Sequence, residues 1–317
     1  MLSHCGRVRH TNEDACGARP ERGVFAVCDG MGGAAAGEIA SHLALNAFLT
    51  ALDASSLAQS SRARNGRIPP RAASTRSAHS STAQLAQAGH RHTGENGSAE
   101  QSANHPHNRL EEAIRAAIRA ANLAVFRQAQ KSRALRGMGT TLVAVLLEEA
   151  AAHPGNGASA EAPSNPTLWL AHVGDSRCYR LRANHLQQLT QDHSLVEEQI
   201  QAGLLSRVQA VSSPVRNIIT RAIGSMPTVE PEIAAHPTQP GDLYLLASDG
   251  LTRELDDARI ASILARTAAS TPISRKTSAD GESSAQTALD LACHALIDAA
   301  NAKGGHDNIT VLLVSLP

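Results

Sequence analysis

The chain has 317 residues, of which 42% are hydrophobic, and its 29 basic residues (Lys and Arg) balance its 29 acidic ones (Asp and Glu). The balanced charge and the 2% aromatic content disfavour a nucleic-acid partner, which would need a basic surface and stacking rings. No apolar run approaches the roughly 20 residues of a membrane span. The five cysteines have no metal-type spacing and indicate reduced thiols. We therefore expect a soluble, cytoplasmic protein.

The chain begins with a pattern that is typical of strands in hairpins. Strands are predicted at residues 2–9, in a short stretch ending near residue 18, and at 24–28, where β-branched and aromatic residues follow Gly23. A helix is predicted next, at residues 34–52, because apolar residues recur there at a spacing of four. These apolar residues are Ile39, Leu43, Ala47 and Ala51.

The remainder of the chain mixes further strands with grouped helices. Asn108 and Glu111 form a capping box that predicts the start of a helix reaching Val125. Further strands are predicted at residues 142–147, 167–173, 177–182, 185–189, 229–235, 242–247 and 309–315, and further helices at 194–206, 257–268 and 285–302. Because strands follow one another in hairpins and helices are grouped, the pattern favours antiparallel sheets with helices on their outer faces.

Three polar, low-complexity segments interrupt the pattern, at about residues 53–107, 153–166 and 269–284. The longest has no aromatic residue and no apolar period, so it cannot bury enough surface to offset the entropy of ordering. We expect one domain spanning residues 1–317 with these inserts disordered. For the longest insert, a solvated spacer is favoured over a docking segment.

The central predicted strand, residues 24–28, runs directly into Asp29 and a run of glycines. A carboxylate at the end of a buried strand is held rigidly and is partly desolvated, which suits it to binding a metal. Gly30, Gly32 and Gly33 allow a sharp turn that exposes carbonyl oxygens, which are ligands for a hard cation. An ordinary strand-to-helix turn with an acidic cap explains this stretch alone equally well.

The same design recurs at five places, each with an acid at the end or edge of an apolar strand: Glu13 with Asp14, Asp29, Asp175, Asp249 and Asp307. If the strands belong to stacked sheets, these ends can meet at one edge. Gathered carboxylates raise one another's pKa, and divalent cations relieve the repulsion. An all-oxygen ligand set favours Mg²⁺ or Mn²⁺ over zinc.

These acids occur in motifs that resemble those of the metal-dependent protein phosphatases (type 2C), in their bacterial branch. The motifs are Arg9-x-x-Asn12-Glu13-Asp14, Asp29-Gly30-Met31-Gly32-Gly33, Gly139-Thr140-Thr141, Val173-Gly174-Asp175-Ser176-Arg177, Ser248-Asp249-Gly250 and Asp307-Asn308-Ile309-Thr310. They run in the family's order from about Gly6 to Val314, interrupted by the three inserts. The resemblance implies an α+β fold, a four-layer αββα sandwich of two antiparallel sheets flanked by helix pairs.

The resemblance also implies hydrolysis of phosphoserine and phosphothreonine in proteins, with two Mn²⁺ or Mg²⁺ ions. Carried over by position, Asp29 would bridge the ions, Asp249 and Asp307 would complete the first site, and Glu13 and the carbonyl of Gly30 would serve the second. Asp14 would order metal-bound water from behind the ligands.

Arg9 would hold the substrate phosphate, because a planar guanidinium matches phosphate better than an ammonium does. A water or hydroxide bridging the ions would attack phosphorus directly, with no covalent enzyme intermediate. The residues expected to carry catalysis are thus Arg9, Asp29, Asp249 and Asp307. For Arg9 the alternative is a surface residue paired with Glu13.

Two positions depart from the family pattern. Met31 stands where animal members have a histidine proposed as general acid. Arg253 stands where many relatives have an aspartate for a third metal, which leaves Asp175 as the chief remaining ligand there and disfavours a third ion.

The segment 249–255 is similar to members that accompany type VI secretion systems and oppose a Ser/Thr kinase. The family pattern also leads us to expect a few residues before the present start.

The resemblance implies phosphoprotein substrates, a cognate kinase pathway and a monomer, with no nucleic acid and no membrane span. One alternative from another class is a catalytically silent member of the same fold that serves as a binding module. Because Glu13, Asp29, Asp249 and Asp307 are all present, the active enzyme is favoured. A metal-dependent nuclease is a further alternative, for which the core lacks a basic groove pattern.

Overall fold

Two antiparallel β-sheets form the centre of the molecule in the computed structural model, which describes residues 1–65, 106–148, 165–210, 213–270 and 281–316. The first sheet has the order β1-β11-β10-β7-β8, formed by β1 (Leu2–His4), β11 (Ile309–Ser315), β10 (Leu243–Ala247), β7 (Arg177–Arg182) and β8 (His185–Gln188). The second has the order β2-β3-β5-β6-β9, formed by β2 (Asp14–Arg19), β3 (Val24–Met31), β5 (Leu142–Glu148), β6 (Thr167–Val173) and β9 (Glu232–Pro237), with β4 (Gly139–Thr140) also paired to β3.

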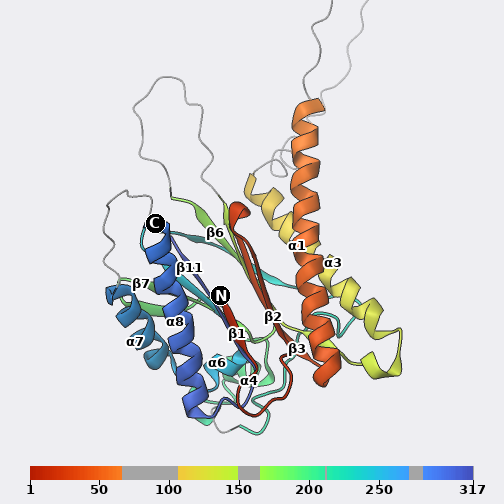
Figure 1. Ribbon diagram of the computed structural model, residues 1–317. Helices are drawn as coiled ribbons and strands as arrows, with labels where there is room; N and C mark the ends of the chain where they lie inside the picture. The colour runs from red at the N-terminus through yellow and green to blue at the C-terminus, as the bar shows by residue number, and fades with distance from the viewer. Residues whose placement is uncertain (66–105, 149–164, 211–212, 271–280, 317) are drawn as a thin grey trace, which may run out of the picture.

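A pair of long helices covers the outer face of each sheet (Figure 1). Helices α1 (Ala34–Asn65) and α3 (Pro106–Ala129) lie on the second sheet, and α7 (Asp257–Ser270) and α8 (Gly281–Lys303) lie on the first. Three short helices, α4 (Leu195–Gln201), α5 (Arg207–Ala210) and α6 (Asp249–Thr252), belong to the connections. The predicted α+β sandwich of four layers is confirmed, and it has the expected antiparallel sheets.

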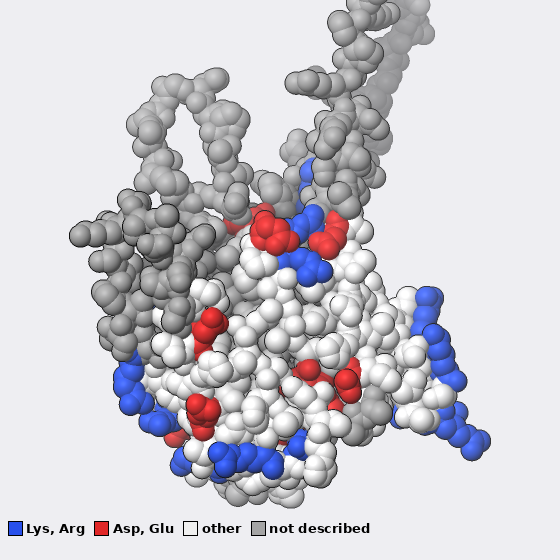
Figure 2. All heavy atoms as spheres, in the orientation of Figure 1, with Lys and Arg blue, Asp and Glu red and all other residues white. Residues whose placement is uncertain are grey.

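Charged side chains on one face of the described residues occur in small separate groups (Figure 2). Basic groups lie mainly along the lower and right-hand edges of this view and acidic groups nearer its middle and top, so no continuous basic strip crosses the centre of the described part of this face. None of the helices that the structure describes is long and apolar enough to cross a lipid bilayer.

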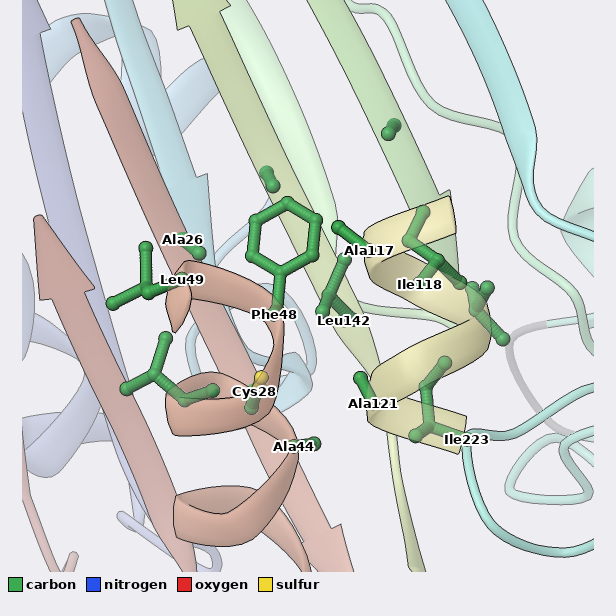
Figure 3. Packing of buried hydrophobic residues seen from close by; sticks show 14 of the residues in the cluster. Ala26, Cys28, Ala44, Phe48, Leu49, Ala117, Ile118, Ala121, Leu142 and Ile223 are labelled. Carbon is green, nitrogen blue, oxygen red and sulfur yellow. The ribbon is translucent and has the colours of Figure 1, made fainter. Parts of the chain in front are cut away.

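The hydrophobic core has one layer between the sheets and one between each sheet and its helices. The layer under α1 and α3 shows how alanine-rich helices pack (Figure 3). Ala44 of α1 and Ala117 of α3 belong to the same buried cluster as Ala26 of β3, and in this view the ring of Phe48 lies between Ala26 and Ala117. All four side chains are fully buried, so a larger residue at any alanine would displace a helix that borders the strand ends.

The face that α1 buries is centred beside the predicted apolar stripe. Ala36, Ala40, Ala44 and Phe48 are buried in the core. Of the predicted stripe, Leu43, Ala47 and Ala51 are partly buried and pack against this core, whereas Ile39 is exposed. Small residues occupy the centre of the buried face because they let the helix approach the sheet closely.

Several element boundaries also differ from prediction. Strand β1 ends at His4 rather than at residue 9, because Gly6 has a φ of 78° and turns the chain toward Asp307. Helix α3 begins at Pro106, two residues before the predicted cap at Asn108. Strand β9 starts at Glu232, three residues later than predicted, and the segment expected to be helical at 194–206 is helical only in α4.

The first predicted insert is shorter than expected, because α1 continues to Asn65 and α3 begins at Pro106. Similarly, α7 reaches Ser270 and α8 begins at Gly281, within the third predicted insert. The remaining parts of the inserts, residues 66–105, 153–164 and 271–280, lie outside the described residues. The single-domain organisation therefore stays a prediction.

Candidate metal centre

The predicted acids meet where the strands of both sheets end, beside α6 and the start of α1 (Figure 1). The second sheet contributes Asp14 and Asp29, which are opposite each other in the β2–β3 register. The first contributes Asp249, at the start of α6 after β10, and Asp307, which comes just before β11. Asp29 and Asp249 line the same hollow, so acids from the two sheets lie together there. We call this group, together with Glu13, the acidic edge.

Two arginines reach the acidic edge. Nη2 of Arg9 lies 2.9 Å from Oδ2 of Asp307, and its Nη1 lies 4.0 Å from Oε1 of Glu13. The alternative considered for Arg9, a pair with Glu13, is thus present but long. Arg253 forms an ion pair with Asp249. The structure therefore brings together the acids predicted from sequence except Asp175, which lines a neighbouring hollow, and positive groups lie beside them.

Backbone and hydroxyl groups hold Asp29 from both sides. Its N–H donates to Oγ1 of Thr141 at 2.9 Å, and its carbonyl accepts from Oγ1 of Thr140 at 2.8 Å. Oγ of Ser176 is 2.7 Å from Oγ1 of Thr141, which extends the network to the loop of Asp175. In the sequence, the only sign of this role is that the two threonines belong to the Gly139-Thr140-Thr141 motif next to β5.

Ser248 connects the two sheets beneath the acids. Its hydroxyl donates to Oδ2 of Asp14 at 2.8 Å and accepts from the N–H of Thr310 at 2.9 Å. All three residues are buried, and Oδ1 of Asp14 has no hydrogen-bond partner in the described part of the chain. Sequence reasoning missed this contact, because it joins residues that are 234 positions apart.

Asn308 fixes the loop that carries Arg9 and Glu13. Its Oδ1 accepts from the N–H of Glu13 at 2.8 Å, and its Nδ2 donates to the carbonyls of Cys5 at 3.1 Å and Thr11 at 2.9 Å. Asn308 therefore orders the loop by hydrogen bonds and does not face away from it.

Two glycines leave room for the acids. A Cβ at Gly30 would overlap the carbonyl oxygens of Glu13 and Gly37, and a Cβ at Gly37 would overlap the carboxylate of Glu13. The first turn of α1 can therefore lie directly against the Glu13 side chain. Gly37 was not singled out in the sequence, although it follows the glycine run by four residues.

The acidic edge suits divalent cations. Burial, more than any other cause, raises the pKa of Asp14 to about 7 and raises the pKa of Asp29, Asp249 and Glu13 as well. Oδ1 of Asp249, like Oδ1 of Asp14, is buried with no hydrogen-bond partner among the described residues. The hollow in front of these acids has a volume of about 360 Å³ and is also lined by Gly30. An all-oxygen group of acids whose charge two arginines offset only in part fits Mg²⁺ or Mn²⁺.

Another possible ligand group consists of His172, His193 and Glu232. In the described residues, it is the one set of three His, Cys, Asp or Glu side chains whose ligand atoms all lie within 4.8 Å of one another. Its hydrogen bonds argue against a metal. Nε2 of His172 donates to the carbonyl of Gln191 at 2.8 Å, and Nδ1 of His193 accepts from the N–H of Gly174, which leaves the His193 proton on Nε2. Both nitrogens facing Glu232 thus carry protons and have no free lone pair.

Comparisons with known proteins agree with this geometry. A family model described as Protein phosphatase 2C matches residues 3–292. The serine/threonine phosphatase stp of Listeria monocytogenes is 31% identical over 312 residues, which cover 98% of this chain and 92% of the relative.

Two solved structures are similar over nearly the whole chain. The catalytic domain of the serine/threonine protein phosphatase PstP, in complex with two manganese ions, is 29% identical with a TM-score of 0.61, covering 98% of this chain and 94% of that one. PppA, described as a key regulatory component of the type VI secretion system in Pseudomonas aeruginosa, is 27% identical with a TM-score of 0.61, covering 99% of this chain and 95% of that one.

Proposed function

Because this chain belongs to the protein phosphatase 2C family and is a metal-dependent protein serine/threonine phosphatase, we propose that its acidic edge is the catalytic centre. The observation that carries the proposal is the convergence of four acids from both sheets on one hollow, where one oxygen of the buried Asp249 has no hydrogen-bond partner among the described residues. Mn²⁺ or Mg²⁺ is the cofactor. Bound there, two such ions supply Lewis acidity and an activated water nucleophile.

Position within the acidic edge suggests which residues hold the ions. Asp29, at the end of β3 in the second sheet, lines the hollow together with Asp249 of the first, so it would be placed to serve both ions. Asp249 and Asp307, from the first sheet, would hold one ion. Glu13 and the carbonyl of Gly30 would hold the other, since both line the hollow on the side of the second sheet.

Asp14 acts from beneath the ligands. Its carboxylate faces Ser248 rather than the hollow, and its raised pKa leaves it able to hold or release a proton near neutral pH. It orients the ligands by charge and hydrogen bonding, and Ser248 fixes that orientation across the sheets.

Arg9 binds the substrate phosphate. Its side chain is 48% exposed at the mouth of the hollow, and it is held there by Asp307. A guanidinium can donate two parallel hydrogen bonds to phosphate oxygens, and it stays charged at every physiological pH. It would thereby orient the phosphorus toward the acidic edge.

The substrates we propose are phosphoserine and phosphothreonine proteins in a pathway run by an opposing bacterial Ser/Thr kinase. The similarity to PppA supports a setting beside a type VI secretion system. The cytoplasmic location and the monomeric state expected from the sequence, and the expectation of no nucleic-acid partner, remain predictions.

Hydrolysis of p-nitrophenyl phosphate and of a phosphothreonine peptide, measured with Mn²⁺ and with EDTA, tests the proposal. Turnover should need Mn²⁺ and should be lost in Asp29→Ala and in Asp249→Ala. Asp298→Ala, which removes an exposed acid on α8, is the matched control and should retain full turnover. Metal binding without turnover of either substrate would instead favour a silent binding module, and turnover of DNA alone would favour a nuclease.

A further inference from the structure

Arg253 places a permanent positive charge inside the acidic edge. It directly follows α6, and its N–H donates to the carbonyl of Asp249 at 2.8 Å, so the short helix fixes its position. Besides its ion pair with Asp249, its guanidinium lies 3.8 Å from Oδ2 of Asp175 and 3.6 Å from Oδ2 of Asp307. With only 32% of its side chain exposed, this charge is poorly screened by water.

Asp175 faces a different hollow from most of the other acids. The hollow of about 360 Å³ is lined by Glu13 and Asp29, whereas Asp175 lines a neighbouring one of about 280 Å³. Arg253 and Asp249 line both. The guanidinium therefore stands where the two hollows adjoin, with Asp175 on the smaller one.

The surroundings of Asp175 show that it needs a cation. Its side chain is buried, and Oδ1 has no hydrogen-bond partner among the described residues. Oδ2 faces Arg253. A buried carboxylate is stable only when its charge is compensated, and a guanidinium, always protonated and weakly hydrated, is well suited to this. A divalent ion at the same place would be repelled by the guanidinium.

We propose that Arg253 is a built-in cation that takes the place of a metal ion at Asp175 and confines metal binding to the larger hollow. Asp175 is then a partner of Arg253 and not a ligand, which differs from the role that the family resemblance implies for it. The inference rests on the metal centre proposed above, because it concerns how many ions that centre admits.

Counting bound Mn²⁺ tests this directly. The assay is equilibrium dialysis at micromolar and at millimolar Mn²⁺, followed by elemental analysis of the bound metal. It is performed on the full chain, on the single variants Asp175→Asn, Arg253→Gln and Arg253→Lys, and on the double variant that combines Arg253→Gln with Asp175→Asn. The unmodified chain should bind two ions, and Asp175→Asn should bind the same number. Arg253→Gln should bind one additional, weaker ion, which the double variant should lose.

The Arg253→Lys variant separates charge from shape, because it keeps a cation and should still bind two ions. Loss of an ion in Asp175→Asn alone, or an unchanged count in a folded Arg253→Gln, would overturn the inference. Circular dichroism establishes folding, and if Arg253→Gln does not fold, the count for Asp175→Asn still decides. An unmodified chain that binds no Mn²⁺ would overturn the proposed centre itself, whereas two ions with the wrong response to these variants would overturn only the role of Arg253.

Discussion

Two buried asparagines with the same number of hydrogen bonds offer a test of how the metal centre is held. Asn308 accepts one bond, from the N–H of Glu13, and donates two to backbone carbonyls. Asn122 on α3 also accepts one, from the N–H of Gly224, and donates two, to the carbonyls of Met226 and Pro227. One asparagine lies beside the acidic edge, and the other joins α3 to a connecting loop.

Replacing either asparagine by alanine should destabilise the protein by a similar amount. Each change removes three hydrogen bonds worth about 1 kcal/mol apiece, or about 3 kcal/mol in total. For a domain of this size that corresponds to a fall in melting temperature of about 6–12 °C. Thermal unfolding in EDTA, followed by circular dichroism, measures this part of the prediction.

Only Asn308→Ala should also weaken metal binding, because only Asn308 holds the backbone of Glu13 in place. Loss of a group that positions a metal ligand typically weakens binding by about 10–100-fold. Calorimetric titration with Mn²⁺, at a temperature where both variants are folded, gives the comparison. Equal Mn²⁺ affinities in Asn308→Ala and Asn122→Ala would refute the reasoning, since stability loss alone would then account for both.

Three further predictions follow from the same centre. Burial raises the pKa of Asp14 and of Asp175 to about 7, so the folded protein keeps protons that the unfolded chain releases above about pH 4. The free energy of unfolding in EDTA should therefore fall as pH rises from 4 to 7. Mn²⁺, which competes with these protons, should raise the melting temperature more at pH 8 than at pH 5. A flat melting temperature across this range would contradict it. Gly37→Ala should lower Mn²⁺ affinity about tenfold or more in a titration, since its Cβ would displace the Glu13 carboxylate, and unchanged affinity would show that this close approach is dispensable. Arg9→Lys should raise KM for a phosphothreonine peptide about tenfold through loss of bidentate phosphate binding; a fall in kcat alone would argue against that role.

Much of the metal centre could be predicted because each acid is marked by local sequence. Asp29, Asp249 and Asp307 each adjoin an apolar strand, and those strands have clear patterns; β11 has the predicted bounds, residues 309–315. What the local pattern leaves open is which strands pair. The opposition of Asp14 and Asp29 depends on the β2–β3 register.

The supporting contacts were harder to predict because they depend on three-dimensional packing. The Ser248 hydroxyl could equally have hydrogen-bonded to nearby backbone or to water. Nothing in the sequence around Ser248 indicates that its partner is Asp14. Gly37 is one of several glycines, and its role appears only once α1 lies against Glu13. The exposure of Ile39 on α1 was hard to predict for a similar reason, since hydrophobicity alone ranks Ile39 above Ala40, whereas close packing against the sheet favours the alanine.

Three ends of helices and strands lie far from the acidic edge. Helix α1 starts just after Asp29 and has 32 residues, so Asn65 lies ~48 Å along the helix from that start. Strand β5 likewise leads away from the acidic edge to Glu148, and the 23-residue helix α8 begins at Gly281 and returns to that edge at Lys303. A change at Asn65, Glu148 or Gly281 is thus separated from the ligands by the length of a helix or strand, so it can alter the surface that the enzyme presents while its chemistry stays the same.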